Sequence, residues 1–379
     1  MVTTEIGLER ITLKDLKEHF NIDGQLKGLR GKIFFYNYDI RKIIELNFSA
    51  RSINRVILLL KHEKIRTLRD IVDIAKEVAW AQYFDNRQTF GVNAERIGKH
   101  DFSSLDVARE LGNIIMKELN AEKKKVKVNL KAPDVKIVAE IINNDFILGI
   151  DTTGPSLHMR RYRVYNHPSP LRTTLAYLLI RIANWKKSET LLDPMCGGGT
   201  IPIEAALYGR NIPILLFRRE EYALYKLSFI DKDIIEKVKA TAVKQAKKSE
   251  KLKIFGLDIN KRHINGAIKN ATSAKVIDTI KFLNENIENL NSIFKPNSFD
   301  VVVTDPPYKL KFKGRMRGLY ETLLKNVFSL LRQGGHCVII TSAARLFESI
   351  ANKLNVKYEK LKMRRDSKLP TAIYTIRKD

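Results

Sequence analysis

A glycine-rich turn between a strand and a helix is the feature that most restricts the fold of this chain. Apolar residues lead to Asp193, and Asp-Pro-Met-Cys-Gly-Gly-Gly-Thr follows as residues 193–200, where a helical sequence begins. Glycines carry no Cβ, so a ligand can approach the backbone closely. Free N–H groups at the start of the helix favour a negative group. The pattern predicts the first half of a nucleotide-binding βαβ unit, although the spacing differs from Gly-x-Gly-x-x-Gly and a purely structural turn stays open.

A second motif follows another apolar strand, over 299–304, and reads Asp-Pro-Pro-Tyr, residues 305–308. This motif resembles the signature of enzymes that methylate exocyclic amino groups of bases. Such an aromatic amine is a poor nucleophile because its lone pair is delocalised into the ring. Two acceptors aimed at its N–H bonds would draw the nitrogen toward tetrahedral geometry. The Asp305 carboxylate and the Pro306 carbonyl are the natural pair, since the two prolines fix the backbone. Tyr308 offers a stacking face for a base taken out of its helix. We therefore expect Asp305, Pro306 and Tyr308 to be catalytic, with no metal.

Together the two motifs resemble the S-adenosylmethionine-dependent amino-methyltransferases. The resemblance implies that cofactor, with Asp258 on the ribose hydroxyls, although a strand-end Asp capping the helix after Asn260 is the alternative. Asn286 stands where the family commonly has an Asp that contacts the adenine amino group; its amide oxygen can still accept, and Glu285 could substitute. We interpret Cys196 as a small residue that fits the turn. The cofactor contacts implied are His167, Pro168, Leu171, Asp193, Met195, Cys196, Gly197, Gly199, Thr200, Asp258, Ile259, Asn286, Ile287 and Asp305.

From residue 173 onward predicted strands and helices alternate, which is typical of a doubly wound α/β sheet with helices on both faces. Residues 210–250 interrupt the alternation with an aromatic and charged segment and a lysine-rich helix. We therefore predict a Rossmann-like methyltransferase domain over 173–379 that carries an insertion.

The sequence of residues 1–64 predicts a small ferredoxin-like α+β unit. Its elements are a strand over Gly31–Tyr38, a helix over Ile40–Leu46 capped by Asp39, and a strand over Ser52–Lys61.

The next unit, residues 65–155, has a strand ending in Ala-Glu-Arg-Ile-Gly-Lys-His-Asp-Phe-Ser-Ser, a helix, and a hairpin closing on Gly-Ile-Asp-Thr-Thr-Gly. It resembles a THUMP domain, the RNA-binding module of several tRNA-modifying enzymes. Arg96, Lys99 and His100 would lie on one loop. Two interpretations remain open: Arg96 and Lys99 contact RNA phosphate, or they belong to an ordinary solvated loop.

Two basic segments flank the catalytic motifs. The linker 156–172 alternates Arg160, Arg161 and Arg163 with tyrosines, which suits backbone contact and stacking on RNA. It also resembles the linker of THUMP methyltransferases, whose His-Pro-x-Pro-Leu segment (residues 167–171 here) helps to cover the cofactor. After the catalytic motif, a predicted substrate loop carries Lys309, Lys311, Lys313, Arg315 and Arg317; a solvated loop is the alternative.

The net charge of +26 indicates a polyanionic partner, because cations that neutralise phosphates release counterions. Two cysteines exclude a disulfide framework and a four-cysteine zinc site. No secretory signal or membrane-spanning apolar run is apparent. We expect a cytoplasmic monomer with tRNA as its partner and no membrane association.

Over most of its length the chain resembles the THUMP-containing tRNA guanine-N2 methyltransferases of archaea and bacteria. The resemblance implies direct methyl transfer to a flipped-out guanine, forming N2-methylguanosine. The glycine motif is closest to the branch acting at position six of the acceptor stem. The alternatives are the position-ten branch, an rRNA guanine-N2 or DNA adenine-N6 methyltransferase, and a tRNA-binding protein without catalysis.

Overall fold

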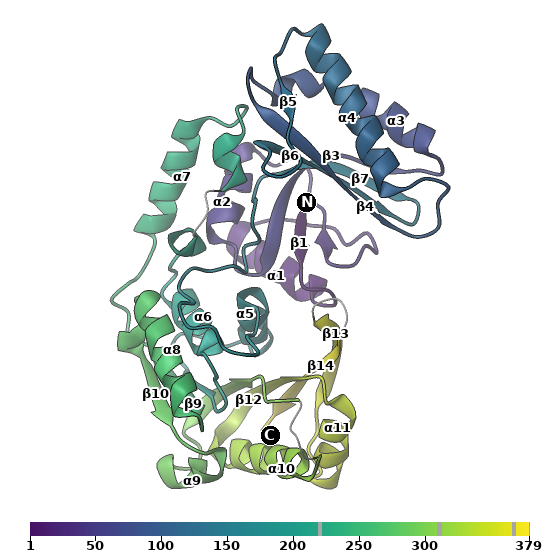
Figure 1. Cartoon of the computed structure of the whole chain (residues 1–379). Coiled ribbons are helices and arrows are strands. Elements are labelled where there is room, and N and C mark those ends of the chain that lie inside the picture. The colour runs from purple at the N-terminus through teal and green to yellow at the C-terminus, as the bar shows by residue number, and fades with distance from the viewer. Residues whose placement is uncertain (219–221, 309–312, 366–368, 379) are drawn as a thin grey trace.

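The computed structural model describes residues 1–218, 222–308, 313–365 and 369–378. Within them the chain forms two seven-stranded sheets, one built from the amino-terminal residues and one from the carboxyl-terminal residues, stacked end to end (Figure 1). No described helix has the length and apolarity needed to cross a membrane.

The amino-terminal sheet has the strand order β2-β1-β3-β7-β6-β4-β5. The predicted strand Gly31–Tyr38 is wrong in length: only Lys32–Ile33 is a strand, Phe34 forms an isolated bridge with Gln25, and Gly31 and Asn37 adopt left-handed conformations. The Asp39 cap is confirmed, since its carboxylate accepts a hydrogen bond from the Lys42 N–H at 3.0 Å. The elements are β1 (Val2–Thr4), α1 (Glu9–Phe20), β2 (Lys32–Ile33), α2 (Ile40–Ser49), β3 (Ile53–Lys64), α3 (Leu68–Lys76), β4 (Thr89–Ile97), α4 (Ser104–Ala121), β5 (Lys127–Val128), β6 (Val135–Ile142) and β7 (Asp145–Asp151).

Strand β3 joins the two predicted amino-terminal units. It pairs with β1 of the first unit and with β7 of the second, both antiparallel. The boundary predicted between residues 64 and 65 therefore falls at the end of a shared strand, and the two units form one continuous sheet.

The carboxyl-terminal sheet has the order β10-β9-β8-β11-β12-β14-β13. Its first five strands are parallel, and β14 and β13 complete it antiparallel. Helices α5, α6 and α8 cover one face and α9, α10 and α11 the other (Figure 1), which is the predicted doubly wound arrangement. The elements are α5 (Thr173–Ile182), β8 (Thr190–Asp193), α6 (Thr200–Gly209), β9 (Lys253–Asp258), α8 (Lys261–Ser273), β10 (Ile280–Asn284), α9 (Leu290–Ile293), β11 (Phe299–Thr304), α10 (Lys313–Leu330), β12 (Leu331–Thr341), α11 (Ala344–Lys353), β13 (Glu359–Arg365) and β14 (Leu369–Arg377).

The insertion at 210–250 packs on the amino-terminal half of the molecule. Its helix α7 (Lys232–Lys244) lies against α2 (Figure 1). Tyr222, Leu224 and Ile235 are buried in the same apolar core as the residues of the amino-terminal sheet. The insertion thus binds the two halves together.

Buried polar contacts reinforce this junction. The Asp15 carboxylate on α1 accepts hydrogen bonds from Ser52 Oγ at 2.7 Å and from the Tyr177 hydroxyl on α5 at 2.6 Å. Arg181 Nε lies 3.1 Å from the same carboxylate. Such contacts stabilise the junction only while every partner is present, because an unpaired buried charge is costly.

Candidate functional site

The glycine turn joins β8 to α6 at the carboxyl edge of the catalytic sheet. Gly197 and Gly199 adopt φ values of +52° and +78°, which residues with a Cβ rarely adopt. A Cβ on Gly199 would lie 2.9 Å from the Ala267 Cβ and 3.1 Å from the Phe282 ring. The reason for glycine at position 199 is therefore helix and sheet packing, whereas Gly197 lines the cavity at this edge.

Asp258, at the end of β9, holds the turn in place. Its Oδ2 accepts from the Gly197 N–H at 3.0 Å, and its Oδ1 accepts from the Asn260 N–H at 2.8 Å. His263 Nδ1 lies 3.3 Å from Oδ1. The capping role considered for Asp258 falls to Asn260, whose side chain accepts from the Arg262 N–H. Asp258 thus faces the cavity with a position fixed by the backbone.

A cavity of about 430 Å³ lies between the glycine turn and the catalytic motif, and a smaller one of about 50 Å³ lies beside it. Every predicted cofactor or catalytic residue except Pro168 and Gly199 lines one or both. The sequence analysis missed Asn260, His263 and Leu319 in this lining. Those predicted and present are His167, Leu171, Asp193, Met195, Cys196, Gly197, Thr200, Asp258, Ile259, Asn286, Ile287, Asp305, Pro306 and Tyr308.

The catalytic motif is supported from below by Tyr320, a buried residue of α10 that sequence reasoning missed. Its hydroxyl donates to the Pro307 carbonyl at 3.3 Å and lies 2.7 Å from Thr341 Oγ1 at the end of β12. Burial raises the pKa of Tyr320 to about 12, so the phenol keeps its proton at neutral pH. This contact fixes the backbone of the motif relative to two neighbouring elements.

Three carboxylates meet at this edge: Asp193, Asp258 and Asp305. Burial, together with the nearby charges of Asp305 and Asp258, raises the pKa of Asp193 to about 8. Burial raises the pKa of the Cys196 thiol well above its ordinary value, so Cys196 is a neutral packing residue rather than a reactive thiolate. The site therefore favours a cationic ligand, which would restore the ionised form of Asp193.

The linker crosses the glycine turn and is fastened to α8. The Asn270 side chain accepts from the Tyr165 N–H at 2.8 Å and donates to the Gly198 carbonyl at 2.9 Å. The Tyr165 ring lies so close to Gly266 that a Cβ there would lie 2.1 Å from it. His167 stands over Gly197, where a Cβ would be 3.1 Å from its Nε2. The linker therefore covers the turn, and cofactor coverage by residues 167–171 stays a prediction.

The prediction that Arg160 contacts RNA is wrong. Arg160 is buried, forms an ion pair with the buried Glu204 on α6, and donates to the Arg51 carbonyl at 3.2 Å. Tyr162 is buried as well and donates to Glu204 at 2.6 Å. The alternating sequence does not show which arginines are buried, because a linker between packed domains has one side facing the protein and one facing solvent. Arg161 is exposed and Arg163 is half-buried.

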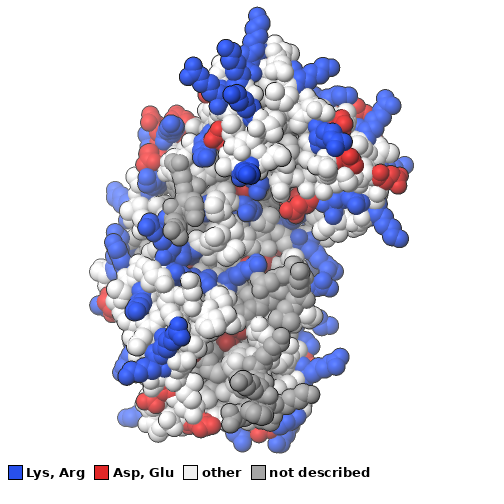
Figure 2. Space-filling view, in the orientation of Figure 1, with Lys and Arg blue, Asp and Glu red and all other residues white. Residues whose placement is uncertain are grey.

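The remaining predicted RNA contacts fall in two parts of the chain. Arg96 is exposed near the end of β4 and donates to the Gly98 carbonyl, whereas Lys99 is exposed on the loop that follows, so the two do not share a loop as predicted. Arg317 is exposed on α10, whereas Lys309 and Lys311 lie outside the described residues. Lys313 and Arg315 fall in the first turn of α10, but their side chains are likewise not described. Lysine and arginine are spread across both halves of the face in Figure 2.

Comparison with known proteins agrees with this geometry. Residues 160–369 match the RMKL-like methyltransferase domain family, and residues 66–151 match the THUMP domain. The tRNA (guanine(6)-N2)-methyltransferase of Methanocaldococcus jannaschii is 35% identical, over 93% of both chains. The enzyme of the same name from Archaeoglobus fulgidus is 33% identical, over 93% of this chain and 85% of its own. A solved structure described as a possible methylase from Clostridium difficile 630 is 27% identical, with a TM-score of 0.86 over 100% of this chain and 97% of its own.

Proposed function

The chain belongs to the RMKL-like methyltransferases that carry a THUMP domain, and we propose that it methylates the N2 amino group of a guanine in tRNA with S-adenosylmethionine. The observation that carries this proposal is the shared cavity. The glycine turn, with Gly197 and Asp258, faces Asp305 and Tyr308 across it. A methyl donor and an amine acceptor held there would meet at one edge of the sheet.

The cavity suits this cofactor in both charge and polarity. Asp193 and Asp305 would face its cation, and Asp258 would accept from its ribose hydroxyls. Ile259 is 69% exposed at the rim, beside Ile287, and would cover an adenine ring. The Asn286 amide oxygen already accepts from the Glu288 N–H at 3.2 Å, so Glu285 can supply a further acceptor. When bound, S-adenosylmethionine supplies a methyl group already activated for transfer.

The residues of the motif would then act on the amine. The Asp305 carboxylate and the Pro306 carbonyl accept its two N–H hydrogens, which directs the lone pair toward the methyl group. Tyr320 holds the Pro307 carbonyl and so keeps the motif rigid. Tyr308 stacks on the extruded base. Orientation of this kind supplies much of the rate acceleration in an enzyme with an activated donor.

The names of the archaeal relatives favour position six of tRNA as the target. The exposed Arg96 and Lys99 on the THUMP unit would bind phosphates away from the reacting base. Position ten is the runner-up, because it uses the same amine chemistry. We assign the reaction to a monomer in the cytoplasm.

The proposal is tested by incubating the protein with S-adenosylmethionine carrying a labelled methyl group and either unmodified tRNA or duplex DNA. Mass spectrometry of the nucleosides should show labelled N2-methylguanosine from tRNA and no labelled product from DNA. Mapping the modified nucleotide would separate position six from position ten. Labelled N6-methyladenine in DNA, or no labelled nucleoside from tRNA, would refute the proposal.

A further inference from the structure

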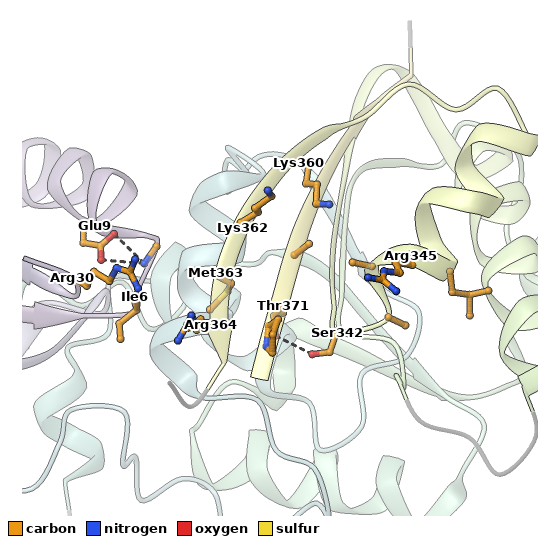
Figure 3. A pocket seen from close by; sticks show the side chains of 16 residues that line it. Ile6, Glu9, Arg30, Ser342, Arg345, Lys360, Lys362, Met363, Arg364 and Thr371 are labelled. Carbon is orange, nitrogen blue, oxygen red and sulfur yellow. Dashed lines mark hydrogen bonds between the residues drawn. The ribbon is translucent and has the colours of Figure 1, made fainter. Parts of the chain in front are cut away.

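A further cavity lies away from the catalytic motif, around the edge strand β13. It measures about 950 Å³ and is open to solvent. One wall comes from the amino-terminal unit, with Ile6, Glu9 and Arg30, and the other from the start of α11, with Arg345 (Figure 3). Lys362 and Arg364 stand between these walls on β13 (Figure 3). We call this feature the edge cleft.

Basic residues outnumber acidic ones in the lining of the edge cleft. Arg30, Arg345, Lys362 and Arg364 are exposed, and none of them forms an ion pair among the described residues, although the charge of Lys362 acts on the Glu348 carboxylate. Lys360 is different, because it forms an ion pair with Glu348 and is already neutralised. Glu9 faces the cleft, but its carboxylate accepts from the Gly7 N–H at 3.0 Å and from the Gly31 N–H at 2.6 Å.

Edge strands often carry lysines that prevent pairing with other chains, and that role would account for β13 alone. It does not account for Arg30 and Arg345, which enter the cleft from two other elements. Four like charges gathered in one cleft repel one another and focus a positive potential into it. This arrangement favours an anionic ligand that carries several charges along its length.

The edge cleft lies close enough to the catalytic motif to contact the same substrate molecule. Strand β13 pairs antiparallel with β14, and β14 pairs antiparallel with β12, so Arg364 lies toward the carboxyl edge of the sheet. The catalytic motif follows β11 at this same edge. Three strand spacings separate β11 from β13, which amounts to about 14 Å at ~4.8 Å per strand. A stacked nucleic-acid strand places a phosphate about every 3.4 Å, so the two sites are a few nucleotides apart.

We propose that the edge cleft binds the phosphate backbone of the substrate RNA beside the nucleotide that enters the catalytic cavity. This inference rests on the proposed function for its partner, but it assigns residues that neither the motifs nor the THUMP unit include. Contacts of this kind fix the position of the strand without reading its sequence. The cleft therefore sets affinity, and the catalytic motif sets the rate.

The test compares two double variants. Lys362→Ala with Arg364→Ala removes two cleft cations, and Lys253→Ala with Lys295→Ala removes two exposed lysines near the opposite, amino-terminal edge of the same sheet. We expect the cleft variant to bind tRNA about tenfold more weakly, with a log–log salt slope reduced by about 1.4 to 1.8 units. Its methylation rate at saturating tRNA and its S-adenosylmethionine affinity should equal those of the wild type. The control variant should keep the wild-type slope to within a fraction of a unit.

Two outcomes would overturn the inference. One is a cleft variant whose tRNA affinity and salt slope match those of the control. The other is a cleft that binds an oligo-glutamate peptide while RNA affinity stays unchanged in the variant. In either case wild-type methylation of tRNA would leave the proposed function standing. A wild-type protein that does not methylate tRNA would instead overturn the proposed function itself. Thermal unfolding of each variant verifies that it is folded.

Discussion

The two sheets of this protein distribute their polar residues differently. The catalytic sheet gathers Asp193, Asp258 and Asp305 at one edge, around a cavity, where burial raises the pKa of Asp193 to about 8. The amino-terminal unit shares a cavity of about 500 Å³ with the insertion, but this cavity contains neither the glycine turn nor the catalytic motif, and the amino-terminal sheet presents exposed cations such as Arg96 and Lys99. This difference supports placing the proposed chemistry in the carboxyl-terminal half, with cations of the amino-terminal half helping to position the substrate.

This comparison depends on a rigid junction, and breaking the junction should have the largest effect. Glu204→Ala would leave Arg160 buried without its carboxylate and remove the acceptor of the Tyr162 hydroxyl. Loss of one partner from a buried ion pair costs about 3 to 5 kcal/mol. Denaturant unfolding should show this loss in the free energy of unfolding.

A double variant that removes both charges of the ion pair provides the comparison for Glu204→Ala. Arg160→Met combined with Glu204→Leu removes both charges, and it should recover much of the stability. A Glu204→Ala protein as stable as the wild type would show that the junction does not rely on this pair. The same junction explains why deleting residues 1–155 would be a poor test of function: Tyr177 and Arg181 would lose Asp15.

The next largest effect should come from the catalytic half. Asp305→Ala removes an acceptor needed most as the amine becomes tetrahedral, so it should lower kcat about a hundredfold or more. Tyr308→Phe keeps the stacking face and should retain much of the rate. Steady-state methylation of tRNA measures both. An Asp305→Ala protein with the wild-type kcat would remove the basis for placing the chemistry at this motif.

A smaller effect should appear in the pH dependence of cofactor binding. Because the pKa of Asp193 is raised to about 8, the folded protein holds this proton and a cationic ligand must displace it. Affinity for S-adenosylmethionine should rise with pH below 8, by up to about tenfold per pH unit. S-adenosylhomocysteine lacks the sulfonium charge but keeps the α-ammonium, so its affinity should stay flat because the proposal places the sulfonium beside Asp193. The affinity of Asp193→Asn for S-adenosylmethionine should stay flat as well. Calorimetry across this range measures all three, and parallel pH profiles for both ligands would contradict the assignment.

In the protein without cofactor, the raised pKa of Asp193 should make the fold less stable as pH rises, whereas the same rise in pH strengthens cofactor binding. A carboxyl whose folded pKa exceeds its unfolded value of 3.8 destabilises the fold as pH rises from there toward 8. Each pKa unit corresponds to about 1.4 kcal/mol at most. Asp193→Asn should therefore make the decline in melting temperature over this pH interval smaller. If the decline is unchanged in Asp193→Asn, other titratable groups cause it.

The parts of the site that could be predicted from the sequence are local in the chain. The glycine turn and Asp305-Pro306-Pro307-Tyr308 each follow an apolar strand, and parallel strands bring their carboxyl ends together. The parts that could not be predicted depend on partners far away in the sequence. Asn270 binds the linker 105 residues before it, and Tyr320 supports a motif through one hydroxyl.

The fold divides in the same way. Strand β13 and the packing of α7 on α2 carry no sequence signal, because they are determined by the surfaces they cover. Arg160 shows the same limit in a single residue. Its neighbours predict a basic surface, but only the folded chain brings Glu204 to it, 44 residues away.

The central claim, that Arg96 and Lys99 of the THUMP unit help to hold the RNA while the catalytic motif performs the transfer, is tested most directly by single-turnover methylation of tRNA at saturating cofactor over a range of tRNA concentrations. The two variants to compare are Asp305→Ala and the double variant Arg96→Ala with Lys99→Ala. The account predicts that Asp305→Ala lowers the maximal rate about a hundredfold or more and leaves the tRNA dissociation constant unchanged. The double variant should keep the maximal rate, bind tRNA more weakly and lose roughly two units of salt slope. The account would be contradicted if the double variant of Arg96 and Lys99 lowered the maximal rate, or if Asp305→Ala weakened tRNA binding.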